Sequence, residues 1–537
     1  MGGAWKDSAG NVSLFFVVLI LLTVEAPFAA GGEPAGGGVY RRPLRAEPST
    51  LDPARVSDIY SRSVSQQIFD GLVQFDQTLT VVPALAQHWK ASRDGLTWTF
   101  TLRKGVRFHN GREVTADDVV FSLTRLLDPR VKSSAADLFT TIRGALDFRE
   151  GRTREIAGLS AVDRTTVRVA LTETFAPFVA LLAIAHAKIV PRDVVESNPD
   201  GFGLHPVGTG PFRFGRWERK SEIVLDANRD YFDGAPRLSR VVYRILAGEA
   251  WDTAYDQFLA GAFEDAPVPI AKYAAAIRNP NHVYVKRPNI TVRFYGINSR
   301  WGPLADRRVR QAVVHALDRQ ALIDEAHHGR YLLARGVLPP GTLGYNPKLT
   351  GYAFDPARAR ELLALAGFPG GQGLPVIPFW AAAKDASVEK EHARMKRALE
   401  TVGVRTEFHY VNDWPSFSRQ VKDGKLPVFQ YAWYADAPDP DNFLFKLFHS
   451  QSRDNVFGYR NPVVDDLLIR ARGESEMQRR VELYRRIEQL VIDDAPIVPV
   501  FHYTYERLFQ PYVRSVEVNG LGDPHIPLRK IWLERKS

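Results

Sequence analysis

Alternating apolar and polar residues predict a series of short β-strands along the chain. Residues 98–102 (WTFTL) alternate strictly, which puts their apolar side chains on one face, directly after the turn dipeptide Asp94-Gly95. Further strands are predicted at residues 166–171, 212–214, 291–297, 428–433 and 499–503. The run 428–433 is mostly apolar, which favours a central position in its sheet.

Apolar residues three and four positions apart predict helices between these strands. Thr115 and Asp118 have the spacing of a capping box, with Asp in place of Glu, and an apolar stripe follows as far as Leu126. A strongly amphipathic helix is expected to begin at Asp306. Further helices are predicted at residues 356–366, 391–401 and 479–493. Strands and helices alternate throughout, so the predicted class is α/β with mixed sheets.

The N-terminus has the pattern of an export signal. Lys6 precedes a long apolar run at residues 12–24, and small residues follow, with Ala29 and Gly31 suited to positions −3 and −1 of a cleavage site. The run is shorter than the roughly 20 residues that span a bilayer. We expect residues 1–31 to direct export to the periplasm, either as a cleaved signal peptide or as a retained N-terminal membrane anchor. Residues 32–38 then form a glycine-rich spacer.

Composition excludes several classes of function. The chain has 537 residues, more than the roughly 250–300 at which a single hydrophobic core stops growing. It contains no cysteine, which excludes disulfides, zinc–thiolate sites, cysteine nucleophiles and a lipid-modified cysteine. The net charge is +9, but basic residues alternate with acids, as in residues 479–488, which is typical of solvated helix faces rather than of nucleic-acid binding.

Several short motifs, in order along the chain, carry a resemblance to a known family. They are residues 47–53 (EPSTLDP), 69–72 (FDGL), 82–89 (VPALAQHW), 111–119 (GREVTADDV), 208–212 (GTGPF), 228–232 (NRDYF), 306–312 (DRRVRQA) and 436–443 (DAPDPDNF). In this respect the chain resembles the family 5 extracellular solute-binding proteins, the dipeptide- and oligopeptide-binding group. The resemblance extends from about Arg41 to Val500.

The resemblance implies a two-lobed fold of the periplasmic-binding-protein type (type II, cluster C) with an extra inserted domain. Transferred to this chain, the boundaries are residues 39–66, 190–284 and 503–537 for domain I, 67–189 for domain II and 285–502 for domain III. Two crossings between the lobes would form a hinge. The resemblance also implies a monomer without a cofactor or enzymatic activity, which delivers short peptides to the permease subunits of an ABC transporter.

Asp436 is the main candidate ligand-binding residue. It follows an apolar strand, so we expect it at a strand end facing a cleft, where a carboxylate needs a cation. In the peptide-binding members, the aspartate at this place pairs with the amino terminus of the ligand. The alternative is a loop-capping role in an Asp/Pro-rich turn, where Asp439 and Asp441 are expected to be turn formers.

Four further residues are candidates for ligand contact. Trp433 matches a pocket residue of the family, and its alternative role is core packing. The backbone of Ala432 to Tyr434 offers hydrogen bonds to an extended peptide. Lys384 lies where some relatives place a cation for the peptide carboxylate, although a solvated surface lysine is the alternative interpretation.

Other motifs do not support a competing activity. Gly208-Thr209-Gly210 is expected to be a tight turn, because Arg213 occupies the place of the third glycine in a dinucleotide fingerprint. Glu325, His327 and His328 lack metalloprotease spacing, so no metal site is predicted. Three alternatives remain open: the same fold binding a metal chelate, an opine or a glycan fragment; a secreted carboxylate hydrolase; and a membrane-anchored sensor subunit.

Overall fold

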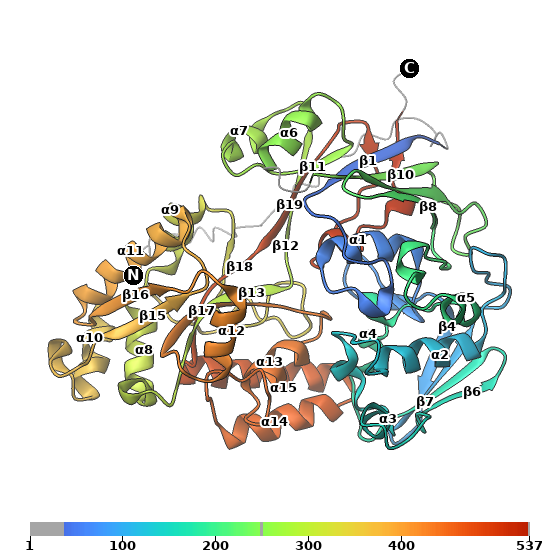
Figure 1. Ribbon diagram of the computed structural model, residues 1–537. Coiled ribbons are helices and arrows are strands. Elements are labelled where there is room, and N and C mark those ends of the chain that lie inside the picture. The colour runs from blue at the N-terminus through green and yellow to red at the C-terminus, as the bar shows by residue number, and fades with distance from the viewer. Residues whose placement is uncertain (1–36, 247–250, 535–537) are drawn as a thin grey trace, which may run out of the picture. The chain divides into compact units, whose positions relative to one another are not determined.

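The strands of the N-terminal part form two four-stranded sheets (Figure 1). The computed structural model describes residues 37–246 and 251–534. The first sheet has the order β1 (Val39–Leu44), β10 (Arg240–Ile245), β9 (Glu222–Ala227), β8 (Phe212–Glu218). The second, antiparallel throughout, has the order β4 (Ala86–Ala91), β5 (Thr97–Leu102), β7 (Thr166–Ala170), β6 (Leu159–Asp163). The chain therefore leaves the first sheet after β1, builds the second, and returns.

The C-terminal part is built on a six-stranded mixed sheet. Its order is β14 (Leu332–Leu333), β18 (Ile497–His502), β13 (Thr291–Ile297), β17 (Val428–Tyr434), β15 (Ile377–Ala381), β16 (Thr406–Tyr410). β13 is antiparallel to both its neighbours, whereas β15 is parallel to both of its own. β17 lies inside this sheet, so the prediction of a central strand over 428–433 is confirmed, as is the α/β class with mixed sheets.

Two adjacent chain crossings connect the six-stranded sheet to a three-stranded one. The smaller sheet has the order β11 (Asp265–Pro267), β19 (Thr504–Phe509), β12 (Val283–Pro288). β12 leads into β13, and β18 leads into β19, while β12 pairs with β19 and β13 with β18. Two neighbouring crossings of a few residues each are the geometry in which a small backbone change rotates one body against another. Two antiparallel two-stranded pairs complete the described strands: β2 (Val73–Phe75) with β3 (Val81–Pro83), and β20 (Val513–Arg514) with β21 (Trp532–Leu533).

Capping residues, Asp58 and Thr115, precede two of the longer helices in this part of the chain. The helices before the hinge are α1 (Ile59–Ile68), α2 (Ala116–Leu127), α3 (Ala145–Arg149), α4 (Phe178–Leu181), α5 (Arg192–Ser197), α6 (Trp251–Leu259) and α7 (Tyr273–Arg278). The predicted capping box of α2 is present: the Thr115 N–H donates to Asp118 Oδ2 at 2.9 Å. No helix of residues 37–246 and 251–534 has the length and apolarity to cross a bilayer. The apolar run 12–24 lies outside the described residues.

The helices after the hinge cover both faces of the six-stranded sheet. They are α8 (Arg307–His315), α9 (Arg319–His327), α10 (Pro356–Leu365), α11 (Ala386–Thr401), α12 (Trp414–Lys422), α13 (Asp441–Phe448), α14 (Pro462–Gly473) and α15 (Met477–Asp494). Asp306 caps α8 as predicted, through the N–H of Arg308 at 2.8 Å. α11 begins before the predicted residue 391, because the Asp385 carboxylate accepts the N–H groups of Ser387 and Val388.

Apolar side chains gather in separate cores, as the length of the chain requires. One core lies between residues 72 and 189, with Ala437 as its one member from the C-terminal part. Two others cover opposite faces of the six-stranded sheet. A further core combines residues 40–69, 190–245 and 509–531. Because Ala437 packs into the first of these cores, the loop after β17 contacts the N-terminal sheets.

The segment at residues 208–210 depends on glycine for close packing. A Cβ atom on Gly208 would lie 2.1 Å from the carbonyl oxygen of Ile68, and one on Gly210 would lie 2.6 Å from the same atom. Only glycine allows this approach of two backbone segments. The chain bends at Thr209 and Gly210, just before β8, and the Gly210 N–H donates to the carbonyl oxygen of Ile68 at the end of α1 at 2.8 Å. The expected tight turn itself stays a prediction.

Candidate functional site

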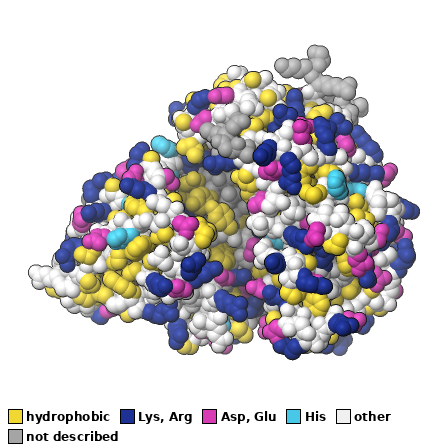
Figure 2. Space-filling view, viewed as in Figure 1, with side chains coloured by type: hydrophobic (Ala, Val, Ile, Leu, Met, Phe, Trp, Pro, Cys, Tyr) yellow, Lys and Arg dark blue, Asp and Glu magenta, His cyan; other side chains and the backbone are white. Residues whose placement is uncertain are grey.

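The carboxyl ends of several strands lie at the same end of the six-stranded sheet. β15, β16 and β17 are parallel, and β18 runs the same way because β17 and β18 are both antiparallel to β13. In open α/β sheets, ligands bind in the crevice outside such strand ends. The space-filling view shows a deep hollow in the described surface, with apolar side chains on its wall (Figure 2).

The backbone of β17 has a free edge near this end of the sheet. Toward β13, every residue of the strand from Val428 to Tyr434 has a partner. Toward β15, pairing stops at Phe429, which lies opposite Trp380. No strand in the described ranges continues this pairing, so Ala432 and Tyr434 lie on an edge to which an extended ligand backbone can add.

Asp436 follows this free edge, and its carboxylate has no partner among the described residues. The side chain is partly buried, and its backbone N–H donates to Asn442 Oδ1 at 3.2 Å. Among residues 37–246 and 251–534, no basic group forms an ion pair with the Asp436 carboxylate and no donor hydrogen-bonds to it. Withdrawing a carboxylate from water without compensation is costly, so this arrangement favours a cationic ligand group.

The two neighbouring acids differ from Asp436 in being paired. Asp439 accepts the N–H of Asp441 at 2.9 Å, as a turn former does, and also pairs with Arg480 at 2.7 Å. Asp441 pairs with Arg472 at 3.1 Å, and burial raises the pKa of the Asp441 carboxyl to about 6. The expected turn role is therefore incomplete for both residues: each is buried and ties the loop to α14 or α15.

Trp433 makes a hydrogen bond that stabilises the loop of Asp436. Its indole N–H donates to the carbonyl oxygen of Asn442 at 2.7 Å, and its ring packs against an apolar core of the six-stranded sheet. These contacts match the packing alternative for this residue. Because Asn442 also accepts the N–H of Asp436, Trp433 helps to fix the position of the Asp436 backbone.

Lys384 follows the neighbouring strand β15 at the same edge of the sheet. Its ammonium pairs with Glu389 at 3.0 Å, and both side chains are about half exposed (50% and 51%). Hydrogen bonding to Glu389 raises the pKa of Lys384. This is the geometry of a solvated surface lysine, and a role for Lys384 toward a ligand carboxylate stays a prediction.

An aromatic wall extends from the end of β17 to the end of β18. The Tyr434 ring stacks on Tyr503, with centroids 5.8 Å apart and an interplanar angle of 17°. Tyr331 stacks on Phe501 at 4.4 Å and meets Tyr503 edge-on at 5.0 Å. Tyr434 remains 61% exposed, so the wall offers open aromatic surface beside Asp436. Sequence reasoning missed this wall, although the aromatic residues at the strand ends were its visible signal.

Behind the aromatic wall lies a buried charge cluster that sequence reasoning also missed. Glu391 is fully buried and accepts from Arg293 at 2.8 Å, from the Tyr295 hydroxyl at 2.6 Å and from His327 at 2.8 Å. Burial by itself would raise the pKa of Glu391, but Arg293 and these hydrogen bonds lower it to about 2. The Arg293 guanidinium also lies 5.0 Å from the Phe501 ring centroid, which links the cluster to the wall.

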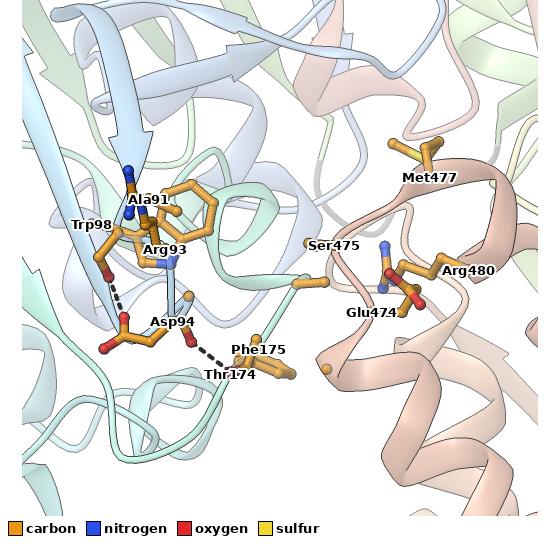
Figure 3. A pocket seen from close by; sticks show the side chains of 14 residues that line it. Ala91, Arg93, Asp94, Trp98, Thr174, Phe175, Glu474, Ser475, Met477 and Arg480 are labelled. Atoms are coloured by element: carbon orange, nitrogen blue, oxygen red, sulfur yellow. Dashed lines mark hydrogen bonds between the residues drawn. The ribbon is translucent and has the colours of Figure 1, made fainter.

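A second contact joins the C-terminal end of α14 to the N-terminal part of the chain. The Ala176 N–H donates to the carbonyl oxygen of Arg472 at 2.8 Å, and the Arg472 guanidinium lies between the rings of Phe175, at 4.7 Å, and Phe445, at 3.8 Å. Beside this contact lies a pocket of about 340 Å³. Trp98 and Phe175 line it from one side and Met477 and Arg480 from the other (Figure 3). Arg472 thus touches both parts of the chain while it pairs with Asp441.

The described residues contain no group of three or more His, Cys, Asp or Glu side chains able to hold a metal ion. His327 is engaged by Glu391, and His328 ends α9 in a left-handed conformation with φ of 55°. The strand edge, the carboxylate and the aromatic wall offer backbone hydrogen bonds, a charge and a stacking surface to a bound molecule, close to the paired chain crossings. This combination is typical of a solute-binding protein.

Comparison with protein families agrees with this class. The family model for bacterial extracellular solute-binding proteins, family 5, matches residues 80–455, and the chain belongs to this family. Its members are non-enzymatic, and the chain is the substrate-binding component of an ABC importer. The chain is 31% identical to heme-binding protein A of Haemophilus influenzae, over 88% of this chain and 89% of that protein. It is 29% identical to the dipeptide-binding protein of Escherichia coli K12, over 94% and 96%.

Solved structures show the same fold. The unliganded open form of the periplasmic murein tripeptide-binding protein MppA superposes with a TM-score of 0.83 at 26% identity, covering 94% of this chain and 99% of that one. DppA of Helicobacter pylori in complex with the peptide STSA superposes with a TM-score of 0.73 at 28% identity, covering 93% and 99%. The predicted periplasmic-binding-protein fold is thereby confirmed.

Proposed function

We propose that this protein captures short peptides between its two lobes and delivers them to the permease of a peptide importer. The observation that carries the proposal is the unpartnered Asp436 carboxylate, which follows a strand with a free backbone edge. A peptide supplies both complements: an α-ammonium group for the carboxylate and an extended backbone for the edge. Relatives named as dipeptide-binding and di/tripeptide-binding proteins support the same substrate class.

In this proposal the amino terminus of the peptide pairs with Asp436. The backbone of Ala432 and Tyr434 bonds the first residues of the peptide, and the Tyr434–Tyr503 pair forms part of a side-chain pocket. Lys384 is our candidate for the peptide carboxylate, which would require it to exchange Glu389 for the ligand. Ligand binding then shifts an existing equilibrium between open and closed lobes.

The proposed domain division follows the same logic. We assign residues 39–66, 190–284 and 503–537 to domain I, 67–189 to domain II and 285–502 to domain III. The separate apolar cores and the paired crossings β12–β13 and β18–β19 support these boundaries. We further propose that residues 1–31 direct export and are cleaved or retained as an anchor, which N-terminal sequencing of the mature protein would distinguish.

Titration calorimetry with di- to pentapeptides, each free and N-acetylated, tests the proposal. A hydrogen bond to a charged group contributes about 1.5–3 kcal/mol. Free peptides should therefore bind roughly tenfold to a hundredfold more tightly than their acetylated forms. Equal affinity for the two forms, or binding of no peptide at all, would exclude the amino terminus as the group that Asp436 recognises.

Heme is the second candidate ligand. The relative that is 31% identical carries the name heme-binding protein A, and the aromatic wall of this chain offers a stacking surface to a flat ring system. Titration of heme followed by its absorption spectrum would test this candidate directly. A spectral shift that free peptides do not compete away would favour heme, whereas no shift would leave peptides as the proposed substrate.

A further inference from the structure

A small, partly open cavity is lined by residues far along the chain from the Asp436 loop. It has a volume of about 70 Å³, enough for a few water molecules or one small ion. The end of α1, the segments around Asp70 and Lys188, and the 3₁₀ turn at Asp523–His525 with the residues after it line the cavity. It therefore lies where the chain enters and leaves the 70–188 segment.

Lys188 is the unusual residue of this cavity. Only 4% of the residue is exposed, and a backbone bridge to Gly71 fixes its position. An ammonium group has three N–H donors. Within the described part of the chain, none of the three has an acceptor and no carboxylate forms an ion pair with Lys188. The Lys188 side chain is therefore buried along its length, and the donors of its ammonium are unused by the described residues where Lys188 lines the cavity.

The one carboxylate that lines the cavity is already occupied by other donors. Asp70 Oδ2 accepts the hydroxyl of Thr209 at 2.8 Å, and Asp70 Oδ1 accepts the hydroxyl of Tyr231 at 2.9 Å. Asp70 lowers the cost of burying Lys188 through space, but it makes no direct contact with the ammonium. The donors of Lys188 are therefore left for a ligand in the cavity.

Besides Asp70 and Lys188, the described lining of the cavity contains the cationic Arg529 and the imidazole of His525. Arg529 lines it while pairing with Asp233 on its outer side, and Arg62 adds a second guanidinium in electrostatic range of His525. Burial, together with Lys188 and Arg62, lowers the pKa of His525 to about 3, so this ring is neutral at pH 7. Burial lowers the pKa of Lys188 only to about 8, which leaves the ammonium mostly charged at pH 7.

We infer that this cavity binds one small inorganic anion, in the size range from chloride to phosphate, with the Lys188 ammonium as its main partner. Neutral His525 lies in the same lining, and its ring N–H can donate a hydrogen bond to the anion. The anion neutralises Lys188 and connects the ends of the 70–188 segment to residues 523–529. This site is independent of the proposed peptide site.

Bromide is the probe that tests the site, because its anomalous scattering identifies it in a crystal. Crystals of the mature protein soaked in sodium bromide should show an anomalous peak within hydrogen-bonding distance of Lys188 Nζ. The peak should be lost in K188M and kept in K530M, in which a nearby exposed lysine paired with Glu517 is changed instead. An ordered water alone at this position in the wild type would overturn the inference.

Thermal unfolding at constant ionic strength gives a second readout. Bromide and phosphate should each raise the midpoint of the wild type and of K530M relative to a large organic anion, but not that of K188M. Methionine replaces the buried charge by an apolar chain of similar length, so K188M should fold and be at least as stable without added anion. An equal bromide effect in K188M and the wild type would contradict the inference. If K188M fails to fold, the wild-type diffraction experiment decides alone.

Discussion

Two acidic residues, Glu391 and Asp436, lie near the same end of the six-stranded sheet, and they differ in whether their carboxylates have partners within the protein. Glu391 is buried in α11 and receives hydrogen bonds from three side chains, one of them the Arg293 guanidinium. Asp436, in the loop after β17, has a carboxylate with no partner among the residues that the structure describes. The first arrangement fixes the wall of the site before any ligand arrives. The second leaves a charge free for the ligand to neutralise.

The difference between the two residues shows how a binding site can have a fixed backbone and still keep one charged side chain available for a ligand. The loop of Asp436 is held by its neighbours, Trp433, Asp439 and Asp441, each of which has a partner within the protein. The binding group itself is left out of this network. Preorganisation of this kind reduces the conformational entropy that a ligand must overcome on binding.

The largest effect on stability is expected when the paired carboxylate of Glu391 is removed. Glu391→Gln removes the charge that Arg293 faces and leaves a buried guanidinium unpaired, which should lower the free energy of unfolding by about 3–5 kcal/mol. Urea unfolding of the purified variant measures this. Glu389→Gln, on the exposed face of the same helix, is the matched control and should change stability by less than about 0.5 kcal/mol. If Glu391→Gln lowered the free energy of unfolding as little as the control, the contrast between Glu391 and Asp436 would be contradicted.

The same residue predicts a dependence of stability on pH. The pKa of Glu391 is about 2 in the folded protein, below its usual value of 4.5, so its stabilising contribution is present above pH 4.5 and is lost as the pH falls toward 2. Between pH 7 and pH 3 the wild type should lose roughly 2 kcal/mol more stability than Glu391→Gln. Parallel loss in the two proteins, measured by urea unfolding at both pH values, would show that Glu391 is not held ionised by its neighbours.

A smaller effect is expected in the Asp436 loop. Burial already raises the pKa of Asp441 to about 6, so its ionised form is poorly stabilised at pH 7 despite Arg472. Asp441→Asn should therefore leave the free energy of unfolding at pH 7 unchanged or raise it, because folding disfavours the ionised carboxylate that Asn replaces. Because the raised pKa makes folding favour the protonated form, the wild-type contribution of Asp441 weakens as the pH rises from 4 to 6, opposite to Glu391. A loss as large as that of Glu391→Gln would remove the distinction between the two acids.

Local patterns in the sequence predicted most of the fold. The strands at 98–102, 291–297 and 428–433 follow from alternation and apolar content, and the start of α2 follows from Thr115 and Asp118. Such patterns extend over only a few residues, so they can be recognised in the sequence without knowledge of the tertiary structure. The start of α11 was predicted less accurately, because a single capping residue, Asp385, fixes where this helix begins.

The site was only partly predictable, for a physical reason. The position of Asp436 after an apolar strand could be predicted, and the family resemblance supplied its proposed role. The pairing of Arg293 with Glu391 joins residues 98 positions apart in the sequence, and no local pattern encodes it. Likewise, Asp439 and Asp441 looked like turn residues, because Arg480 and Arg472 reach them only through tertiary packing.

The most direct test of the central claim is a binding comparison with Asp436→Asn. Calorimetry would compare one free peptide and its N-acetylated form on the wild type, on Asp436→Asn and on the control Asp466→Asn, whose side chain is 69% exposed on α14. The wild type and the control should prefer the free peptide by roughly tenfold to a hundredfold. In Asp436→Asn this preference should nearly disappear, while the free energy of unfolding stays within about 0.5 kcal/mol of the wild type. A preference that survives intact in Asp436→Asn would contradict the account.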